Sequence, residues 1–231
     1  MTPLPNAPIV VAIDGRAGTG KSTVARRLAA ELGVPYLDTG AMYRALTLHA
    51  LEHGVDPDDR AAVARLLPET HLELRLDAGG RAEVLLHGWP VEPRIRTPEV
   101  TAATSRLAVH PEVRERMVLL QRELAERHGG VLEGRDIGTR VLPDAPFKFY
   151  LRAEPRVRVR RRLGDLHAAG RTEVTEDELA RELEERDARD RSRPHSPLVP
   201  AADAIEIDTS ERTVDEVVAE MLARIGSARS R

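Results

Sequence analysis

The chain of 231 residues carries 35 lysine and arginine side chains against 38 aspartate and glutamate side chains, for a formal net charge of −3. This balance gives no reason to expect non-specific nucleic-acid binding, and an aromatic content of 3% argues against a protein that stacks single-stranded bases. The absence of cysteine excludes a disulfide framework and thiol catalysis. The sequence has no apolar run of membrane-spanning length and no signal-peptide pattern, so we expect a soluble cytoplasmic protein without a membrane partner.

Predicted strands and helices alternate along most of the chain, whose length suits one α/β domain with an insert or two small domains. Apolar, β-rich runs predict strands at residues 9–13, 34–38, 131–133, 147–151 and 204–207. Helical spacing and capping signals predict helices that begin near residues 22, 39, 60, 98, 111, 155, 176 and 214. The last two are predicted to begin with capping boxes, Thr175 with Glu178 and Thr213 with Glu216. This order predicts a parallel sheet covered by helices on both faces, with ligands bound at the carboxyl ends of its strands.

One segment departs from this alternation. Leucines alternate with polar residues over 71–76, Ala78–Gly80 predicts a turn, and the chain returns over 82–87. We therefore expect a β-hairpin insert outside the parallel sheet, with Trp89 and Val91 packed at its base.

The stretch from Gly15 to Ser22 fits the pattern G-x-x-x-x-G-K-[ST], the P-loop, between a predicted strand and a predicted helix. Glycines allow the tight path of the loop, its N–H groups can surround phosphate oxygens, and the helix N-terminus favours an anion. Lys21 is expected to reach the β- and γ-phosphates, and the Ser22 hydroxyl to face Mg²⁺, the predicted metal. The predicted residues of this nucleoside-triphosphate site are Gly15, Arg16, Ala17, Gly18, Thr19, Gly20, Lys21, Ser22 and Thr23.

Lysine usage supports a functional loop rather than an ordinary glycine-rich turn. The chain has two lysines, Lys21 and Lys148, and otherwise uses arginine as its cation. A lysine at the one position where a compact ammonium group is needed therefore indicates a functional P-loop. A regulatory GTPase would need an Asn-Lys-x-Asp motif, yet the one asparagine is Asn6 in the N-terminal tail. A small phosphotransferase or a nucleotide-dependent binding module remains.

The arginines favour phosphoryl transfer, which depends on cations that converge on the moving phosphoryl group. Candidates are Arg44, Arg135, the run 156–162 and the segment 186–193. Each has a plainer interpretation. Arg44 could cover its own helix, and Arg135 could be a turn arginine, although its place between Gly134 and Asp136 makes this less usual. The run 156–162 could be a solvated face or bind nucleic acid, and the segment 186–193 could be partly an i,i+4 ion-pair ladder.

Two further features have structural rather than chemical interpretations. His49 and His53 are four residues apart, as in some metal sites, but no third ligand is evident and we expect surface histidines. Trp89 is expected to pack in the hairpin rather than to stack on a base.

Six blocks together resemble bacterial cytidylate kinases (CMP/dCMP kinases), of the nucleoside-monophosphate kinase group. They lie at residues 13–21, 37–44, 95–100, 133–139, 186–193 and 197–204, and the resemblance covers nearly the whole chain. It implies an α/β fold with a three-layer α/β/α P-loop kinase core and a parallel sheet. It also implies a small β-rich NMP-binding insert at 69–97 and an Arg-rich lid near 156–175, with the core at 1–68 and 98–231. The implied reaction is transfer of the γ-phosphoryl group of ATP to CMP or dCMP with Mg²⁺.

The resemblance also implies roles for individual residues. The acceptor phosphate is assigned to Thr39, Arg44 and Arg135, cytosine to Ser105, Arg114 and Asp136, and the ribose to Arg186 and Asp190. Arg193 completes the site near the phosphates, and the lid run 158–162 approaches those of ATP. The implied catalytic residues are Lys21, Arg135, Arg162 and Arg193. The chemistry of the base agrees, because a carboxylate and a hydroxyl can accept from the cytosine amino group and a guanidinium can donate to N3 or O2. Uracil would bring its O4 acceptor against these acceptors.

The departures from the family are few. Arg16 stands where the family usually has proline, and Glu133 either positions Mg²⁺ or orients the arginines. Another small-molecule P-loop kinase, such as a UMP/CMP, adenylate or shikimate kinase, and an ATP-dependent regulatory module remain as alternatives. We expect a monomer, because no apolar stripe is evident beyond the core.

Overall fold

A computed structural model describes residues 9–77, 82–168 and 170–229. The parallel strands are β1 (Val10–Gly15), β2 (Tyr36–Asp38), β6 (Gly130–Gly134), β7 (Phe147–Arg152) and β8 (Ile205–Asp208). The helices are α1 (Lys21–Leu32), α2 (Thr39–Glu52), α3 (Arg60–Leu66), α4 (Pro98–Leu107), α5 (Pro111–His128), α6 (Pro155–Ala168), α7 (Glu176–Ser192) and α8 (Val214–Arg229). The strands β3 (Leu72–Leu76), β4 (Ala82–Leu86) and β5 (Trp89–Pro90) form a separate sheet.

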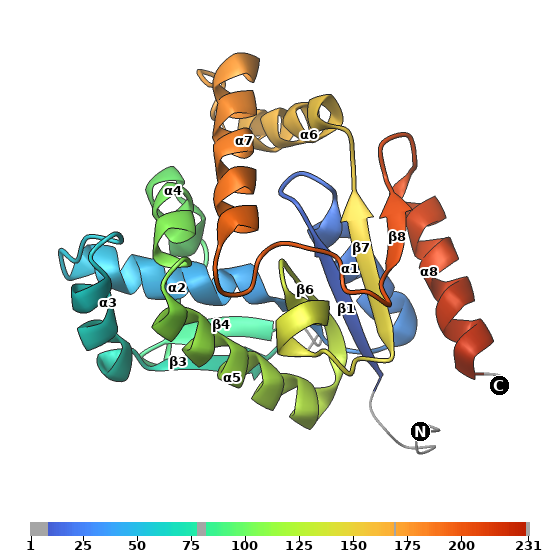
Figure 1. Ribbon diagram of the computed structural model, residues 1–231, viewed down its shortest axis with the longest axis horizontal. Coiled ribbons are helices and arrows are strands. Elements are labelled where there is room, and N and C mark those ends of the chain that lie inside the picture. The colour runs from blue at the N-terminus through green and yellow to red at the C-terminus, as the bar shows by residue number, and fades with distance from the viewer. Residues whose placement is uncertain (1–8, 78–81, 169, 230–231) are drawn as a thin grey trace.

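The main sheet has the strand order β2-β6-β1-β7-β8, and all its pairings are parallel. The central strand β1 lies between two strands that come more than a hundred residues later, with Val11 paired to Val131 on one side and to Phe147 on the other. Strands β2 and β6 lie on one side of β1, and strands β7 and β8 lie on the other. The strand order therefore reverses at β1, and a crevice forms at such a switch point of a parallel sheet. The P-loop follows β1 and therefore lies at the carboxyl end of the central strand (Figure 1).

Helices cover both faces of the main sheet. On one face, Val24 and Leu28 of α1 and Val218 of α8 pack against Val11 and Ile13 of β1. Ala12, between those two residues, faces the opposite side, as the two-residue period of a strand requires. There, Leu124 of α5 and Leu37 of β2 join a second apolar cluster. Burial of each large side chain stabilises the fold by about 1.5–3 kcal/mol. The predicted three-layer α/β/α arrangement and parallel sheet are confirmed.

The small antiparallel sheet packs on α2. Its strand order is β3-β4-β5, and Val84 and Leu86 of β4 join Met42 and Leu46 of α2 in one apolar cluster. The prediction for Trp89 was wrong: it lies on the edge strand β5 and is 76% exposed, whereas Val91 beside it is buried. The predicted turn at Ala78–Gly80 lies outside the described residues.

The histidine prediction was half wrong. His49 is buried in α2, where the centre of its ring lies 4.2 Å from that of His53 and 4.8 Å from that of His87 of the hairpin, with the rings tilted against each other. Burial lowers the pKa of His49 to about 4, and the neighbouring imidazoles add to this shift. The i,i+4 spacing thus places one histidine in the core and the other at its exposed edge. Among the described residues, no group of three or more His, Cys, Asp or Glu side chains is arranged to hold a metal.

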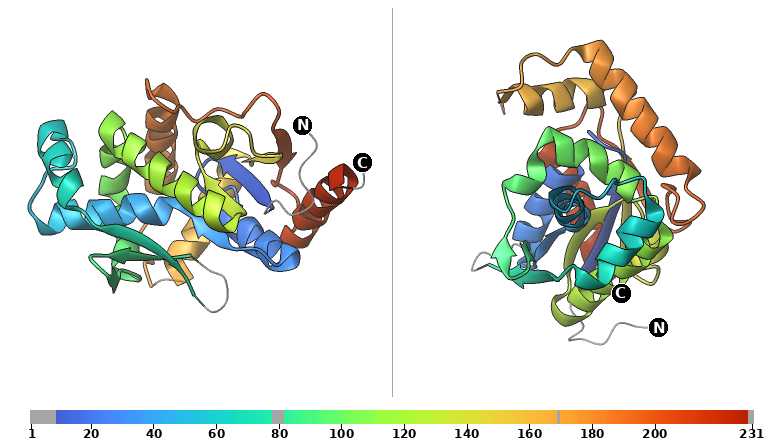
Figure 2. Two further views of the ribbon diagram at one scale, coloured as in Figure 1. Left: turned by 90° about the horizontal axis from the view of Figure 1, so that it is seen from below. Right: turned by 90° about the vertical axis from the view of Figure 1, so that its left-hand side faces the viewer.

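Helices α6 and α7 stand together beyond the carboxyl ends of the strands (Figures 1 and 2). Val159 of α6 and Leu179 and Leu183 of α7 form a small apolar cluster between them. The predicted capping box is present, because the Thr175 hydroxyl accepts from the Glu178 N–H while the Glu178 carboxylate accepts from the Thr175 N–H. Within the described ranges, no helix is long and apolar enough to cross a membrane.

Candidate active site

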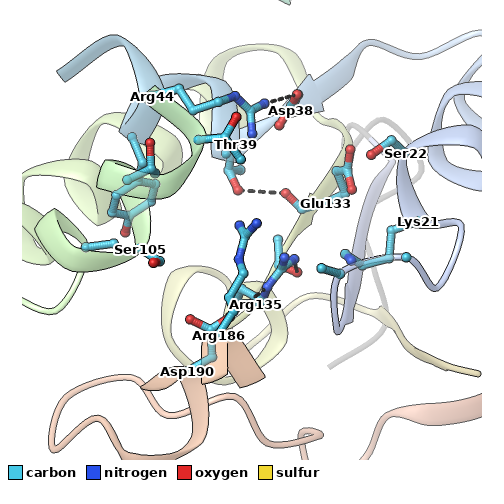
Figure 3. A pocket seen from close by; sticks show the side chains of 18 of the residues that line it. Lys21, Ser22, Asp38, Thr39, Arg44, Ser105, Glu133, Arg135, Arg186 and Asp190 are labelled. Carbon is cyan, nitrogen blue, oxygen red and sulfur yellow. Dashed lines mark hydrogen bonds and ion pairs between the residues drawn. The ribbon is translucent and has the colours of Figure 1, made fainter. Parts of the chain in front are cut away.

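A cavity of about 310 Å³ opens at the carboxyl edge of the sheet, between the P-loop, α2, α4, α5 and α7. It brings together most of the site residues that the sequence predicts, as Figure 3 shows for those it labels. The predicted residues that line it are Ala17, Gly18, Gly20, Lys21, Ser22, Thr23, Thr39, Arg44, Ser105, Arg114, Arg135, Asp136, Arg162, Arg186, Asp190 and Arg193. The other three predicted residues, Gly15, Arg16 and Thr19, are not part of the lining and support the loop from behind.

Gly15 and Thr19 fix the path of the loop. Gly15 has a φ of +152°, and a Cβ there would lie 2.3 Å from the carbonyl oxygen of Leu151, so no side chain fits. The Thr19 hydroxyl is buried and donates to the carbonyl of Arg16 at 2.9 Å. Helix α1 begins after Gly20 without a side-chain cap, so its first N–H groups are available to an anion.

Lys21 is buried at the bottom of the pocket. Its ammonium donates to the carbonyl oxygen of Arg16 at 2.7 Å, which draws the loop around the side chain. Burial lowers the pKa of Lys21 to about 7, and the positive charge of nearby Arg135 acts in the same direction. Bound phosphate would restore the charged form, so the side chain is suited to bind an anion.

Asp38 and Arg96 belong to the site although sequence reasoning assigned them no role. Asp38 Oδ2 accepts from Arg44 at 2.8 Å and from Arg96 at 2.9 Å, and the Asp38 side chain also caps α2 through Ala41. Burial alone would raise the pKa of Asp38, but the two guanidinium groups hold it below its usual value. Asp38 lies in the block at 37–44 and Arg96 in the block at 95–100. The family resemblance of these two blocks was therefore the signal that could have identified both residues.

Thr39 and Glu133 close the wall between the ends of β2 and β6. The Thr39 hydroxyl donates to the carbonyl of Glu133 at 2.6 Å, so it must rotate before it can donate to a ligand (Figure 3). The Glu133 carboxylate is buried and accepts from the Tyr36 hydroxyl at 2.6 Å. Figure 3 shows this carboxylate on the side of Lys21 and Ser22.

A buried ion pair marks the far end of the pocket. Arg114 Nη2 donates to Asp136 Oδ2 at 2.5 Å, and about 4% and 6% of the two side chains are exposed. Burial works to lower the pKa of Arg114, but the Tyr43 hydroxyl and Asp136 hold it above its usual value. The Arg114 guanidinium lies 5.5 Å from the centre of the Tyr43 ring. Ser105 lines the same end, with its hydroxyl 3.3 Å from the carbonyl of Ala102.

Asp136 is held in place by Asp14, which sequence reasoning also missed. The Asp14 carboxylate at the end of β1 accepts from the N–H groups of Ile137 and Gly138 at 2.8 and 2.7 Å. Burial raises the pKa of Asp14 to about 6, against the effect of these two hydrogen bonds. The π-helical turn at residues 137–141 that follows Asp136 is thereby fixed to the centre of the sheet.

The end of α7 brings arginines and one carboxylate into the pocket. Asp190 accepts from Arg135 Nε at 3.1 Å and pairs with Arg193 on its other oxygen. Burial would raise the pKa of Asp190, but these arginines hold it below its usual value. Removal from water lowers the pKa of Arg186 to about 10, and Arg135 adds to this effect. Part of the predicted i,i+4 ladder is present outside the pocket, where Arg189 lies 3.8 Å from Glu185.

The arginine run of α6 divides between two tasks, so the expectation that all of 158–162 faces the phosphates was too broad. Arg162 lines the pocket. Arg158 is buried and bonded to Asp187 and to the carbonyl of Ala17, and Arg161 donates to Thr209. Helical spacing explains the division, because positions 158, 161 and 162 point in different directions around the helix.

The pocket residues fit anionic ligands and Mg²⁺. The Nε atoms of Arg44, Arg186 and Arg193 are buried without a hydrogen-bond partner among the described residues, which is the state expected of donors awaiting an anion. Ser22 and Glu133 offer oxygen atoms on the P-loop side, the ligand type that Mg²⁺ prefers. Mg²⁺ usually keeps several waters and binds the protein through one or two side chains and substrate phosphates, so this sparse donor set suits it.

Comparisons with known proteins identify the family. The family model described as "Cytidylate kinase" matches residues 11–227. The cytidylate kinase of Pelotomaculum thermopropionicum is 50% identical over 219 residues, which cover 95% of this chain and 96% of the relative. That of Corynebacterium glutamicum is 47% identical over 229 residues, with 99% of each chain covered. A solved structure of an uncharacterized protein from Eubacterium ventriosum has a TM-score of 0.53 at 15% identity and covers 95% of this chain and 99% of its own, which supports the fold alone. The chain belongs to the cytidylate kinase family.

Proposed function

We propose that this chain transfers the γ-phosphoryl group of ATP to the phosphate of CMP and dCMP, giving CDP and dCDP. Cytidylate kinase activity follows from the family match over residues 11–227. The observation that supports the detailed assignment is the composition of one cavity, which joins a P-loop, a group of arginines with free donors and a buried Arg114–Asp136 pair.

The P-loop side would bind ATP. The N–H groups at the start of α1 would surround the phosphates, and Lys21 would neutralise charge on the β- and γ-phosphates. Ser22 would hold Mg²⁺, with Glu133 near enough in the pocket wall to orient its waters; bound Mg²⁺ neutralises the charge of the triphosphate. Arg162 would approach the same phosphates from α6.

The arginines opposite would bind the acceptor phosphate and stabilise the transferring group. Arg44 and Arg135 would hold the phosphate of CMP, Arg186 and Asp190 the ribose, and Arg193 would complete the ring of donors. Phosphoryl transfer spreads charge over the moving oxygens, so fixed guanidinium donors around them lower the barrier. Thr39 would contribute its hydroxyl after releasing the Glu133 carbonyl.

The base would lie at the end formed by Ser105, Arg114 and Asp136. The carboxylate would accept from the cytosine amino group, and Arg114 would donate to N3 or O2. Uracil would place its O4 acceptor opposite the same carboxylate, so the site would discriminate against UMP.

We also propose the division of labour along the chain: residues 1–68 and 98–231 form the core, residues 69–97 bind the monophosphate, and residues near 156–175 form a lid. Closure of the lid and insert would exclude water, which would otherwise accept the phosphoryl group. We propose a monomer that acts in the cytoplasm, where both substrates are used.

An acceptor panel tests the proposed function. Turnover of CMP, dCMP, UMP, AMP and GMP is measured with ATP and Mg²⁺ in a coupled ADP-release assay, with Arg135→Ala as the site variant. We expect kcat/KM for CMP and dCMP to exceed that for UMP by at least about tenfold, since a mismatched buried hydrogen bond costs at least that factor. Comparable turnover of UMP or AMP, or unchanged turnover in Arg135→Ala, would contradict the proposal.

A further inference from the structure

Helix α7 contacts the pocket and the P-loop through different faces. Arg186 and Asp190, one turn apart, line the pocket. Asp187 lies about 100° around the helix from Arg186 and is directed toward the P-loop and α6 instead. The mechanism of phosphoryl transfer assigns no task to this buried carboxylate.

A buried arginine connects Asp187 to the P-loop. Arg158 Nη1 donates to Asp187 Oδ2 at 2.6 Å, while Nε of the same guanidinium donates to the carbonyl oxygen of Ala17 at 2.8 Å. About 4% of the Arg158 side chain and 6% of the Asp187 side chain are exposed. A planar guanidinium binds two acceptors in a fixed geometry, so the position of Ala17 is tied to that of α7.

The backbones of the loop and α6 are also in contact at Gly18. A Cβ at Gly18 would lie 2.8 Å from the carbonyl oxygen of Arg158. The loop therefore cannot move toward α6 without moving it, and the Ala17 hydrogen bond opposes movement away. The P-loop, Arg158 and Asp187 form one connected unit.

Asp187 retains capacity for a second cation. Its Oδ1 atom is buried and has no hydrogen-bond partner within the described ranges. Arg16 Nη1, at the second position of the P-loop, lies 3.8 Å from Asp187 Oδ2, which is an ion pair but too long for a hydrogen bond. A small movement of the loop would bring this guanidinium within hydrogen-bonding distance.

We propose that Asp187 and Arg158 are positioning residues that couple the P-loop to α7, so that ATP and CMP each strengthen the binding of the other. Arg16 strengthens this coupling by hydrogen bonding to Asp187 when the loop closes on a triphosphate. The inference rests on the proposed function, because ATP would order the loop and CMP would order α7 through Arg186 and Asp190. The second ligand then meets a unit that the first has already ordered, and the coupling is the same in both directions.

The test measures CMP binding by isothermal titration calorimetry with and without β,γ-imido-ATP and Mg²⁺. The ratio of the two dissociation constants is the coupling factor. In the unaltered protein we expect a coupling factor of at least about five, within the usual range for coupled sites. Asp187→Asn and Arg158→Lys should bring the factor to within about twofold of one, and Arg16→Gln should lower it less. The matched control is Glu185→Gln on the exposed face of α7, which should keep the full factor.

Several outcomes would overturn the inference. A coupling factor of one in the unaltered protein, or an unchanged factor in Asp187→Asn and Arg158→Lys, contradicts it. A purely structural role would lower the melting temperature and both single-ligand affinities with the factor unchanged, and this pattern also contradicts it. If Asp187→Asn fails to fold, the coupling factor of Arg16→Gln is the test of the inference, because the Arg16 side chain is 36% exposed. An unaltered protein that phosphorylates CMP without coupling refutes the coupling alone, whereas one that neither binds nor phosphorylates CMP refutes the proposed function.

Discussion

Asp136→Asn is the sharpest test of the proposed base-binding end, because the change keeps the size of the side chain and removes its charge. Asp136 is paired with Arg114 at 2.5 Å, and both side chains are almost fully buried. Removal of one member of such a pair costs about 3–5 kcal/mol when nothing replaces it. That cost falls on the stability of the unliganded protein, and the asparagine carbonyl, which still accepts from Arg114, limits it. The effect on CMP use comes instead from the lost charge-assisted hydrogen bond to the cytosine amino group, which contributes about 1.5–3 kcal/mol.

This free energy sets the expected change in kinetics. A loss of about 1.5–3 kcal/mol corresponds to a decrease of roughly ten- to a hundredfold in kcat/KM for CMP, since each 1.36 kcal/mol is a factor of ten. The KM for ATP should stay within about twofold, because the P-loop contacts are unaffected. The ratio of UMP to CMP turnover should rise, because the asparagine amide can donate to O4 of uracil.

The assay is steady-state turnover of CMP and UMP at saturating ATP, with thermal unfolding as the check on folding. The control is Asp144→Asn, the same chemical change at an exposed position before β7. Equal losses for CMP and ATP, or an unchanged UMP to CMP ratio in a folded variant, would refute the assignment of Asp136 to base recognition.

Three further changes test the environment of the loop. ATP binding at pH 8 should take up a proton, because burial lowers the Lys21 pKa to about 7 before binding and a bound phosphate raises it. Calorimetry in buffers of different ionisation enthalpy measures the uptake, and Lys21→Met should abolish it. The Asp14 pKa is raised from 3.8 to about 6, so its stabilising contribution is complete below pH 3.8 and is lost as the pH rises through 6. Unfolding free energies of the unaltered protein and Asp14→Asn should therefore change relative to each other by roughly 2 kcal/mol between pH 4 and 7, and parallel pH profiles would contradict this. Gly15→Ala should unfold at lower temperature by several degrees, because a Cβ there lies 2.3 Å from a backbone oxygen. A melting temperature equal to that of Gly164→Ala, a position in α6 where the Cβ meets nothing within 4 Å among the described residues, would be inconsistent with the crowding.

The fold was largely predictable because its signals are local. Strand runs, the glycine-rich loop and two capping boxes each lie within a few residues of sequence, and the structure places them as expected. The exposure of Trp89 and the burial of His49 were not predictable in the same way. They depend on which strand forms the edge of the hairpin and on how α2 packs against it, and neither follows from spacing.

The candidate site was predictable where a motif or a family block names the residue, and less so where a partner comes from far along the chain. Tyr36 and Glu133 are 97 residues apart, and Ala17 and Arg158 are 141 apart. Nothing in local spacing pairs them, because the parallel sheet brings its strand ends together only after folding. Arg158 illustrates the consequence: it lies in the predicted arginine run, yet it binds a carboxylate and the P-loop backbone instead of facing the pocket.

The pocket contains carboxylates that pair with its arginines, yet its charges still favour anions. Its described lining residues include eight lysines and arginines against five aspartates and glutamates, in a chain whose net charge is negative. Asp38 and Asp190 each hold two arginines, which keeps like charges at fixed positions and limits their mutual repulsion. The excess positive charge remains for the ligands, as do the Nε donors of Arg44, Arg186 and Arg193, which have no hydrogen-bond partner within the described ranges. The acceptor phosphate and the triphosphate both carry the negative charge that this excess attracts, so the pocket is suited to hold both substrates at once, which is the state in which transfer occurs.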